Sequence, residues 1–242
     1  EHMGDPDYWK VPLDMFKSKK YAKNRISDIR MDQSTPSKAV YAGSPNGYES
    51  PETTHYSVVD QWGNAVSVTT TINLSYGNGC VVEGAGFFLN NEMDDFSAKP
   101  GIPNAFGLIG NEANSIAPKK RPLSSMTPTI VLKDNKPFLV VGSPGGSTII
   151  TTTMQTILNV VDYEMDIKEA VCASRFHSQW LPDVIQIEPR GLTKDVLVNL
   201  KSRGHEIIYR GGYIGESNGI MITDEGFFGG GDCRGETSAL GY

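Results

Sequence analysis

The chain of 242 residues has a formal net charge of −6, with 38% hydrophobic and 21% charged residues. This composition is typical of a globular chain that can bury a sizeable core. Segment 1–52 holds eight basic and eight acidic residues, so the acidic excess lies in 53–242. A mildly acidic body without a basic stripe argues against nucleic-acid binding. No run of about 18 apolar residues is present, so we expect no transmembrane segment.

The three cysteines, Cys80, Cys172 and Cys233, are far apart and form no C-x-x-C pair. An odd, sparse set gives no sign of a disulfide framework or a zinc site. We therefore expect three buried free cysteines that act as small hydrophobic side chains. We also expect no metal and no cofactor.

In chain order, residues 5–32 carry helix formers with apolar positions at rough helical spacing, which predicts partial helix. Residues 33–52 hold three prolines, and this composition is typical of a loop or a flexible strap. Two β-rich runs flank residues 60–64 and predict a hairpin. The run 86–91 predicts a short buried strand, and 128–143 predicts a second hairpin.

After this hairpin, residues 147–163 place apolar side chains at helical spacing, so we expect a helix there. The apolar positions are Ile149, Ile150, Met154, Ile157, Leu158 and Val161. Two more helices are expected at 166–173 and 193–203, the second ended by Gly204. The remaining strands and turns are expected at 183–189, 205–210, 219–224 and 226–231. Antiparallel strands covered by helices predict an α+β layered sandwich.

Two adjacent threonines, Thr53 and Thr54, separate the strap from the first predicted strand. A hydroxyl nucleophile needs a base, and a threonine that begins a chain can use its own α-amine. That role requires a cut directly before Thr53. The alternative is that both threonines simply favour a strand.

The acidic stretch 89–101 brings Glu92, Asp94 and Asp95 within four residues. Carboxylates this close repel one another, so a solvated loop is one interpretation. A site that binds an ammonium group is the other. The calcium-loop pattern is absent, which argues against calcium.

Two further motifs suit a substrate that carries negative charge. The hydroxyls of Ser124 and Ser125 can donate to a carboxylate, although they could also form only a turn. Gly145 and Gly146 join a strand to a helix, where backbone N–H groups can stabilise an oxyanion. The alternatives are a tight turn or a phosphate cradle, and no Walker lysine follows. With Thr53, these pieces supply the parts of an amide-cleaving site.

The stretches TTHYSVVD, GNAVSVT, LNNEMDDFSAKPG, KRPLSSMTPTIV, GSPGGS and RFHSQWLPD resemble the small subunit of bacterial members of the γ-glutamyltranspeptidase family. The resemblance covers essentially all of 53–242, whereas 1–52 resembles the C-terminal tail of the large subunit with its strap. It implies an N-terminal-nucleophile hydrolase with an αββα sandwich, only part of which lies in this chain. It also implies self-cleavage at Glu52–Thr53.

The activity implied by the resemblance is γ-glutamyl transfer and hydrolysis of glutathione and other γ-glutamyl amides. Thr53 would form a γ-glutamyl intermediate, and water, an amino acid or a peptide would accept the acyl group. Thr71 would support the nucleophile, and Gly145 and Gly146 would form the oxyanion hole. The implied substrate-binding residues are Asn73, Glu92, Asp95, Ser124 and Ser125, with Phe106 where many bacterial members have a tyrosine on a lid.

The resemblance further implies a partner, the remaining large-subunit polypeptide, and a periplasmic or secreted location. Without that partner, one apolar face of the strands in 53–242 would be uncovered. Two alternatives remain open: an inert fragment or assembly module, and a relative that acts on poly-γ-glutamate or on glutaryl-cephalosporin.

Several other residues are expected to be structural. A threonine with its own amine needs no further base, so His177 is expected to be structural. His55 should point away from the site because strand side chains alternate. Trp180 is expected in the core or at a subunit contact, and Asp232 and Arg234 are expected to form an ion pair.

Overall fold

The computed structural model describes residues 2–40, 53–97, 99, 101, 110–189 and 191–241. Glu52, Phe106 and the part of the strap beyond residue 40 lie outside the described residues. The expectations placed on them therefore stay predictions.

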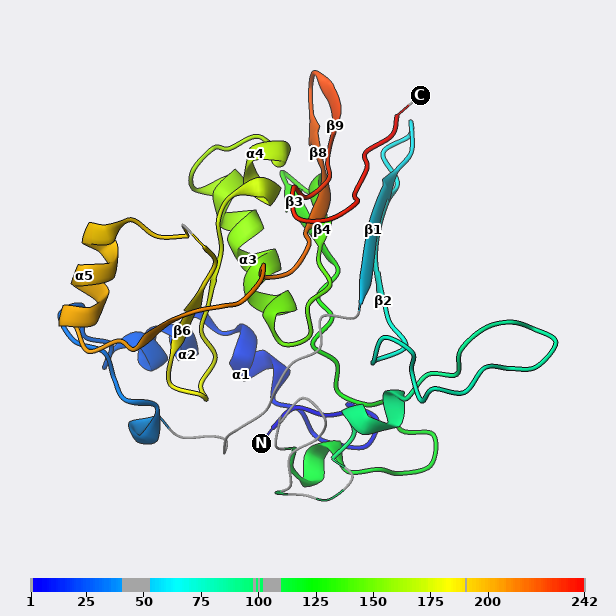
Figure 1. Cartoon of the computed structure of the whole chain (residues 1–242), viewed down its shortest axis with the longest axis horizontal. Helices are drawn as coiled ribbons and strands as arrows, with labels where there is room; N and C mark the ends of the chain where they lie inside the picture. The colour runs from blue at the N-terminus through cyan, green and yellow to red at the C-terminus, as the bar shows by residue number, and fades with distance from the viewer. Residues whose placement is uncertain are drawn as a thin grey trace.

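A four-stranded antiparallel sheet in the order β3-β4-β8-β9 forms the centre of the fold (Figure 1). Its strands are β3 (Thr129–Lys133), β4 (Lys136–Gly142), β8 (Asn218–Thr223) and β9 (Gly226–Gly230). The predicted hairpin at 128–143 is confirmed as β3 and β4. Its tip contains Asp134 and Asn135, both with positive φ, a conformation that asparagine and aspartate tolerate in tight hairpin turns.

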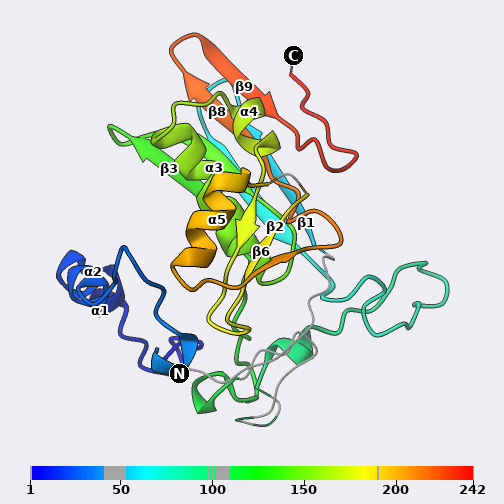
Figure 2. The ribbon, with the colours of Figure 1, turned by 60° about the vertical axis from the view of Figure 1, so that its left-hand side comes forward.

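A separate hairpin of β1 (Thr54–Val59) and β2 (Ala65–Thr70) packs on one face of this sheet. Figure 1 shows the helices, the central sheet and the hairpin as successive layers, and Figure 2 shows the same layers more nearly face-on, with β1 and β2 behind the central sheet. Strand side chains alternate between faces. His55 accordingly points inward and is buried, whereas Tyr56, Val58 and Val66 lie on the outer face and are about half exposed. The predicted hairpin is confirmed, and so is its uncovered apolar face.

Helices α3 (Thr148–Val161) and α4 (Ile167–Cys172) cover the opposite face of the central sheet. The main core lies between this sheet and the two helices. It consists of Leu139, Val141, Val160, Ile167, Ala170 and Val171. The layers therefore run helix, sheet, sheet, which is three of the four layers of an αββα sandwich.

The helix predicted at 147–163 is confirmed, but its buried face differs from the apolar pattern. The face toward the sheet carries Thr148, Thr152, Thr156 and Val160, at a spacing of one helical turn. The apolar stripe formed by Ile150, Met154, Leu158 and Val161 is instead 38–51% exposed. Small hydroxyl side chains let the helix approach the sheet closely. Thr148 Oγ1 donates to the Gly145 carbonyl, and Thr156 Oγ1 contacts the Thr152 carbonyl and Ser217 Oγ.

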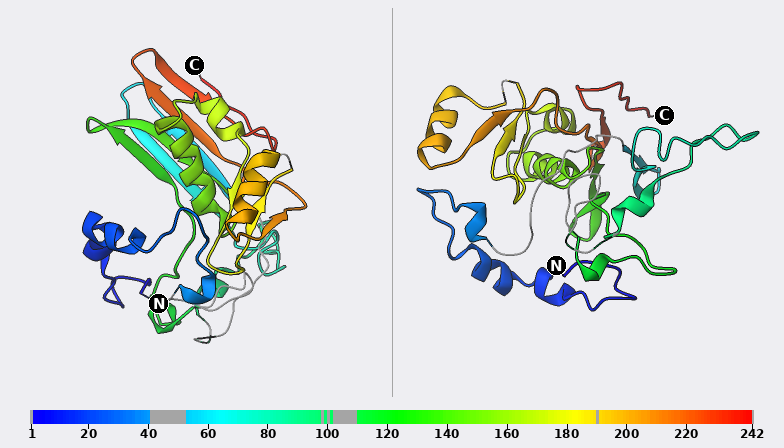
Figure 3. Two further views of the ribbon diagram at one scale, coloured as in Figure 1. Left: turned by 90° about the vertical axis from the view of Figure 1, so that its left-hand side faces the viewer. Right: turned by 60° about the horizontal axis from the view of Figure 1, so that its bottom comes forward.

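A small third sheet of β5 (Phe176–His177), β6 (Ile185–Ile187) and β7 (Ile207–Tyr209) lies beside α3 together with α5 (Lys194–Ser202). Figure 3 shows this unit next to the main layers and the N-terminal helices apart from them. Those helices, α1 (Leu13–Lys17) and α2 (Lys19–Ile26), contain no buried residue. None of the described helices is long and apolar enough to cross a membrane.

Two expectations from the sequence were wrong. Residues 86–91 form no strand: only an isolated bridge joins Phe88 to Val81, and the side chains of Phe87 and Phe88 are partly exposed rather than buried. The cysteines are not all buried and free. Cys172 and Cys233 form a disulfide, with Cα atoms 5.2 Å apart, and Cys80 is exposed. The fold places α4 beside the segment after β9, although 61 residues separate the two cysteines.

Candidate active site

A cavity of about 390 Å³ lies where the β1–β2 hairpin, the loops that follow it and the start of α3 meet. It brings together most of the residues expected from the sequence. The predicted residues that line it are Thr53, Thr71, Asn73, Asp95, Ser124, Ser125 and Gly146. Glu92 and Gly145 are not among the described residues that line the cavity. Each is next to one that does, because Glu92 is hydrogen-bonded to Asp95 and Gly145 directly precedes Gly146.

Hairpin register places the two threonines opposite each other. Thr54 pairs with Thr70, so Thr53, one residue before β1, faces Thr71, one residue after β2. Antiparallel partners of this kind lie close enough to interact. Both residues line the cavity. A hydroxyl nucleophile at Thr53 would therefore have a second hydroxyl beside it.

Asn73 fixes the loop that leaves β2. It has a positive φ of 74° and is 5% exposed. Its backbone N–H donates to Thr71 Oγ1 at 2.9 Å, and its Nδ2 donates to the Asn91 carbonyl at 3.1 Å. Asn91 Oδ1 in turn accepts from the Leu74 N–H at 3.1 Å. This exchange joins the loop after β2 to the acidic stretch that follows Asn91.

The acidic stretch forms a 3-10 turn over Glu92–Asp95. Burial, followed by the charge of Asp95 and a hydrogen bond to it, raises the pKa of Glu92 to about 7. Burial also raises the pKa of Asp95. Two adjacent carboxyl groups that are partly buried favour the binding of a cation, which would relieve their repulsion. Glu92 thus contributes to the cavity through Asp95.

Asn114 is a site residue that the sequence analysis missed. It is 6% exposed, and its Nδ2 donates to the Asp95 carbonyl at 2.7 Å. Its Oδ1 accepts from the Leu123 N–H at 2.9 Å, directly before the two serines. Asn114 therefore links the proposed ammonium and carboxylate sites. No local pattern around it indicates this role, because both partners are distant in sequence.

The serine pair lines the same cavity as Asp95 of the acidic turn. Ser125 Oγ donates to the Gly146 carbonyl at 3.2 Å. Ser124 Oγ accepts from the Met126 N–H at 3.1 Å, which leaves its own proton available to a ligand. The pair is thus attached to the glycine turn at the start of α3.

The turn Gly145–Gly146 has the conformation that only glycine adopts readily. Gly145 has φ +133° and Gly146 has φ +57°. A Cβ at Gly145 would also come within 2.5 Å of Thr148 Oγ1. Within the described part of the chain, neither glycine N–H donates a hydrogen bond to the protein. Two such N–H groups next to the start of a helix can bind a developing oxyanion.

The residues expected to be structural make contacts within the fold, and Trp180 is half-buried. His177 is buried, contacts Thr151 Oγ1 at 2.7 Å and Gln179 Oε1 at 2.8 Å, and has its pKa lowered by burial. His55 contacts Thr69 Oγ1 at 2.8 Å, and burial lowers its pKa to about 4. Trp180 Nε1 donates to the Ser37 carbonyl at 2.9 Å. Neither histidine is among the described residues that line the cavity.

The layered fold, with a threonine at the start of an inner hairpin, is that of the N-terminal-nucleophile hydrolases. A family model described as Gamma-glutamyltranspeptidase matches residues 1–242. The chain belongs to the γ-glutamyltranspeptidase family. It is 48% identical over 235 residues to the glutathione hydrolase proenzyme of Escherichia coli K12, covering 97% of this chain and 40% of that protein. The chain thus spans about two fifths of that relative's length.

Two solved structures support the fold assignment. A mutant γ-glutamyltranspeptidase from Helicobacter pylori is 59% identical in sequence to this chain and superposes with a TM-score of 0.72. The match covers 75% of this chain and 100% of the Helicobacter pylori chain. The cephalosporin acylase from Bacillus halodurans has a TM-score of 0.78 over 100% of this chain and 42% of its own. At 24% identity, this second likeness shows the fold alone.

Proposed function

We propose that this chain provides the catalytic half of an enzyme that transfers and hydrolyses γ-glutamyl groups, with Thr53 as nucleophile. The observation that carries the proposal is the shared cavity of Thr53, Asp95 and the serine pair. It combines a hydroxyl with groups suited to an ammonium and to a carboxylate. Relatives named glutathione hydrolase proenzyme support glutathione and other γ-glutamyl amides as substrates.

We propose two parts within the chain, 1–52 as the tail of a large subunit and 53–242 as the small subunit. In the precursor, Thr53 Oγ1 would attack the Glu52 carbonyl and displace its own backbone nitrogen. That step frees the α-amine of Thr53, and water then hydrolyses the resulting ester, which frees the carboxyl of Glu52 and the hydroxyl of Thr53. The Helicobacter pylori chain supports this boundary, because it is covered in full yet matches only 75% of the present chain. Residues 53–242 make up about that share.

In the mature enzyme, the α-amine of Thr53 would accept the proton of Oγ1 as this oxygen attacks the γ-carbonyl. The tetrahedral oxyanion would bind the N–H groups of Gly145 and Gly146. Collapse expels the amine, which takes the proton, and leaves a γ-glutamyl ester on Thr53. Water, an amino acid or a peptide then attacks the ester and releases the hydroxyl. Thr71, opposite Thr53, would donate a hydrogen bond to the nucleophile.

Substrate orientation would follow from the charges around the cavity. The α-ammonium would bind Asp95, with Glu92 behind it, and Asn73 would hold the turn that carries them. The α-carboxylate would bind the hydroxyl of Ser124, and that of Ser125 once its proton turns away from the Gly146 carbonyl. A glutaryl substrate lacks the ammonium, so the acidic turn favours a free glutamyl group over glutaryl-cephalosporin. Phe106 stays a candidate lid residue on the strength of the resemblance.

We propose that the partner is the polypeptide that corresponds to the rest of the longer relatives. None of the described residues that line the cavity is Arg or Lys, so the positive charge for a carboxylate would come from the partner. Two uncovered apolar surfaces would bind it: the outer face of β1–β2 and the stripe on α3 from Ile150 to Val161. The disulfide Cys172–Cys233 suits an oxidising compartment, which supports a periplasmic or secreted location.

The test is hydrolysis of a chromogenic γ-glutamyl anilide by this chain, with and without the remaining family polypeptide, followed by electrophoresis. We expect cleavage into two bands and turnover only in the complete protein, and neither in Thr53→Ala. A single uncleaved band in the complete protein, with no turnover, would instead support the inert-fragment alternative. Turnover of poly-γ-glutamate in preference to the anilide would favour the polymer-cleaving alternative.

A further inference from the structure

We infer that two hydroxyl side chains behind the glycine turn, those of Ser143 and Thr148, are positioning residues that aim the N–H groups of Gly145 and Gly146. The inference rests on the proposed acyl transfer at Thr53. The inference concerns the carbonyl groups of the Pro144–Gly145 and Gly145–Gly146 peptide units, which face the protein interior. Ser143 and Thr148 are both 0% exposed, so neither touches a ligand in the cavity.

The first contact fixes the Gly145 N–H. Ser143 Oγ donates to the Pro144 carbonyl at 2.6 Å. That carbonyl and the Gly145 N–H belong to one peptide unit, which is planar and trans. In such a unit the C=O and the N–H point in opposite directions. A hydroxyl that holds the carbonyl toward the interior therefore directs the N–H away from it.

The second contact fixes the Gly146 N–H in the same way. The Gly145 carbonyl accepts from Thr148 Oγ1 at 2.7 Å and from the Thr148 N–H at 3.1 Å. This carbonyl shares a peptide unit with the Gly146 N–H. Because glycine has little rotational preference of its own, these hydrogen bonds determine how both peptide planes are oriented. Neither N–H has a protein partner in the described part of the chain.

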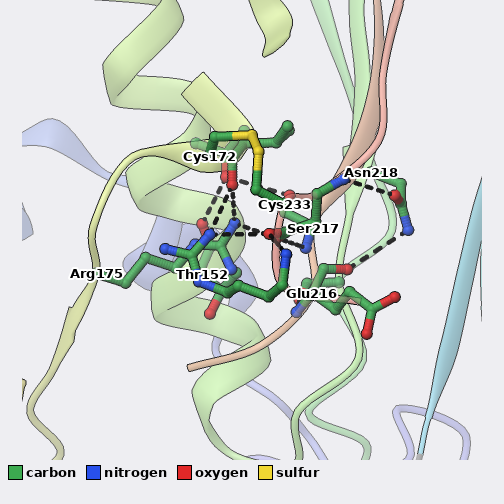
Figure 4. Close-up of polar contacts among 12 residues, drawn as sticks. Thr152, Cys172, Arg175, Glu216, Ser217, Asn218 and Cys233 are labelled. Carbon is green, nitrogen blue, oxygen red and sulfur yellow. Dashed lines mark hydrogen bonds and ion pairs between the residues drawn. A yellow bond between two sulfur atoms is a disulfide. The ribbon is translucent and has the colours of Figure 1, made fainter. Parts of the chain in front are cut away.

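A buried network holds Ser143 in turn. Its Oγ accepts from the Glu216 N–H at 3.0 Å. The next residue, Ser217, donates from Oγ to the Gly142 carbonyl at 3.1 Å and from its N–H to Asp232 at 2.6 Å. Figure 4 shows this network between α3, the loop before β8 and the disulfide. The loop is packed tightly, since a Cβ at Gly215 would come within 2.7 Å of Ser143 Oγ.

Asp232 connects this network to the cross-linked part of the fold. Its carboxylate also accepts from Arg175 at 2.6 Å, and it directly precedes Cys233. The path from the disulfide to the glycine turn therefore runs through Asp232, Ser217 and Ser143. This path accounts for the buried polar side chains that lie behind the Gly145–Gly146 turn.

The experiment compares Ser143→Ala and Thr148→Val with Thr153→Val in the complete protein. Thr153 lies on the same helix, is 2% exposed, and its hydroxyl has no partner among the described residues. We expect each of the first two changes to lower kcat by roughly tenfold to a hundredfold, less than the loss of an oxyanion donor itself. KM should stay within about twofold, and Thr148→Ser should restore kcat. Rates are expressed per cleaved chain, so that a difference in the extent of processing does not enter the comparison.

A second measurement separates positioning from general damage. A glutamate analogue with a boronic acid in place of the γ-carboxyl forms a tetrahedral adduct with Thr53 Oγ1, whereas glutamate does not. In Ser143→Ala and Thr148→Val, the inhibition constant of the boronic acid should rise by the same factor as kcat/KM falls, while that of glutamate stays constant. Equal kcat values in Thr148→Val and Thr153→Val would overturn the inference, as would equal weakening of both inhibitors. Should Ser143→Ala not fold, the three threonine variants decide. An inactive wild type would instead refute the proposed function.

Discussion

The carboxylate of Asp5 accepts hydrogen bonds from both the guanidinium and the backbone N–H of Arg121. The backbone N–H of Arg121 donates to Asp5 Oδ2 at 2.8 Å. Arg121 Nε donates to the same oxygen at 3.0 Å, and Arg121 Nη2 donates to Asp5 Oδ1 at 2.5 Å. Asp5 is 4% exposed, and the Arg121 guanidinium and N–H hold its pKa well below the usual range. The contact attaches the segment before the strap to the loop that carries Ser124 and Ser125.

We predict that Asp5→Asn raises KM for a γ-glutamyl anilide about three- to tenfold, with a smaller change in kcat. An amide cannot accept two charge-assisted hydrogen bonds from Arg121, so the serine loop loses its anchor. Asp7→Asn is the matched control, because Asp7 also contacts Arg121 but its side chain is 73% exposed. Equal KM values for the two variants would contradict this role of Asp5.

The acidic turn should give the enzyme a pH-dependent KM. Burial and Asp95 raise the pKa of Glu92 to about 7, so Glu92 is largely protonated below that pH in the free protein. A protonated carboxyl attracts an ammonium weakly. KM should therefore fall as pH rises through about 7. Steady-state kinetics between pH 5.5 and 9 would measure this effect.

Glu92→Gln isolates the effect, because glutamine does not titrate. Its KM should be high and nearly constant with pH. The dependence of kcat on the Thr53 α-amine should persist, since that amine must be neutral to act as base. An unchanged slope of KM with pH in Glu92→Gln would show that another group titrates.

The same raised pKa predicts a cost in stability. A carboxyl whose pKa in the folded state lies above its ordinary 4.5 stabilises the fold below pH 4.5. This stabilisation is lost as pH rises through about 7. Glu92→Gln should consequently be more stable than the wild type at pH 8, and this advantage should shrink toward pH 5. Thermal unfolding at both pH values would detect it. A constant difference would mean that Glu92 is not the titrating group.

Most of the residues predicted for the site line one cavity, whereas much of the packing around that cavity was not predicted. The hairpin that joins Thr53 to Thr71 could be predicted from alternation and a turn, whereas Thr71 was assigned to the site by the family resemblance alone. The buried face of α3 could not be predicted, because its threonines are buried only once the helix packs on the sheet, and the Thr156 hydroxyl donates to Ser217 Oγ, 61 residues away. No local pattern encodes a contact that distant in sequence.

The disulfide shows the same limit. The spacing of Cys172 and Cys233 carries no information about their separation in space, which depends on α4 lying beside β9. Asp232 and Arg234 were expected to pair, and Arg234 NH1 does reach Asp232 at 2.9 Å. Asp232 also pairs with Arg175, 57 residues away, and Arg234 with Glu188, 46 residues away, and neither contact was foreseen.

We predict that the double change Cys172→Ser and Cys233→Ser destabilises the protein by about 2–4 kcal/mol. A cross-link between residues 61 apart restricts the unfolded chain strongly. Urea unfolding under non-reducing conditions would measure the loss. Cys80→Ser should have no such effect, because Cys80 is exposed and free. Equal stability of the double variant and Cys80→Ser would show that the bond does not form.

The buried ion network offers the sharpest stability test. Two arginines, Arg175 and Arg234, face two carboxylates, Asp232 and Glu188, so the cluster is neutral, and its side chains are at most 7% exposed. Asp232→Asn would leave a net positive charge in the interior. We expect a loss of about 3–5 kcal/mol in the free energy of unfolding.

An exposed pair provides the control for that substitution. Arg30 and Asp32 are joined at 2.8 Å, but their side chains are 60% and 73% exposed. Water and salt screen such a pair, so Asp32→Asn should change stability by less than about 1 kcal/mol. Urea titrations of both variants at low and high salt would compare them. The loss of stability in Asp32→Asn should fade with added salt, whereas that in Asp232→Asn should persist, because the buried cluster is shielded from salt. A loss in Asp232→Asn as small as that in Asp32→Asn would mean that water reaches Arg175.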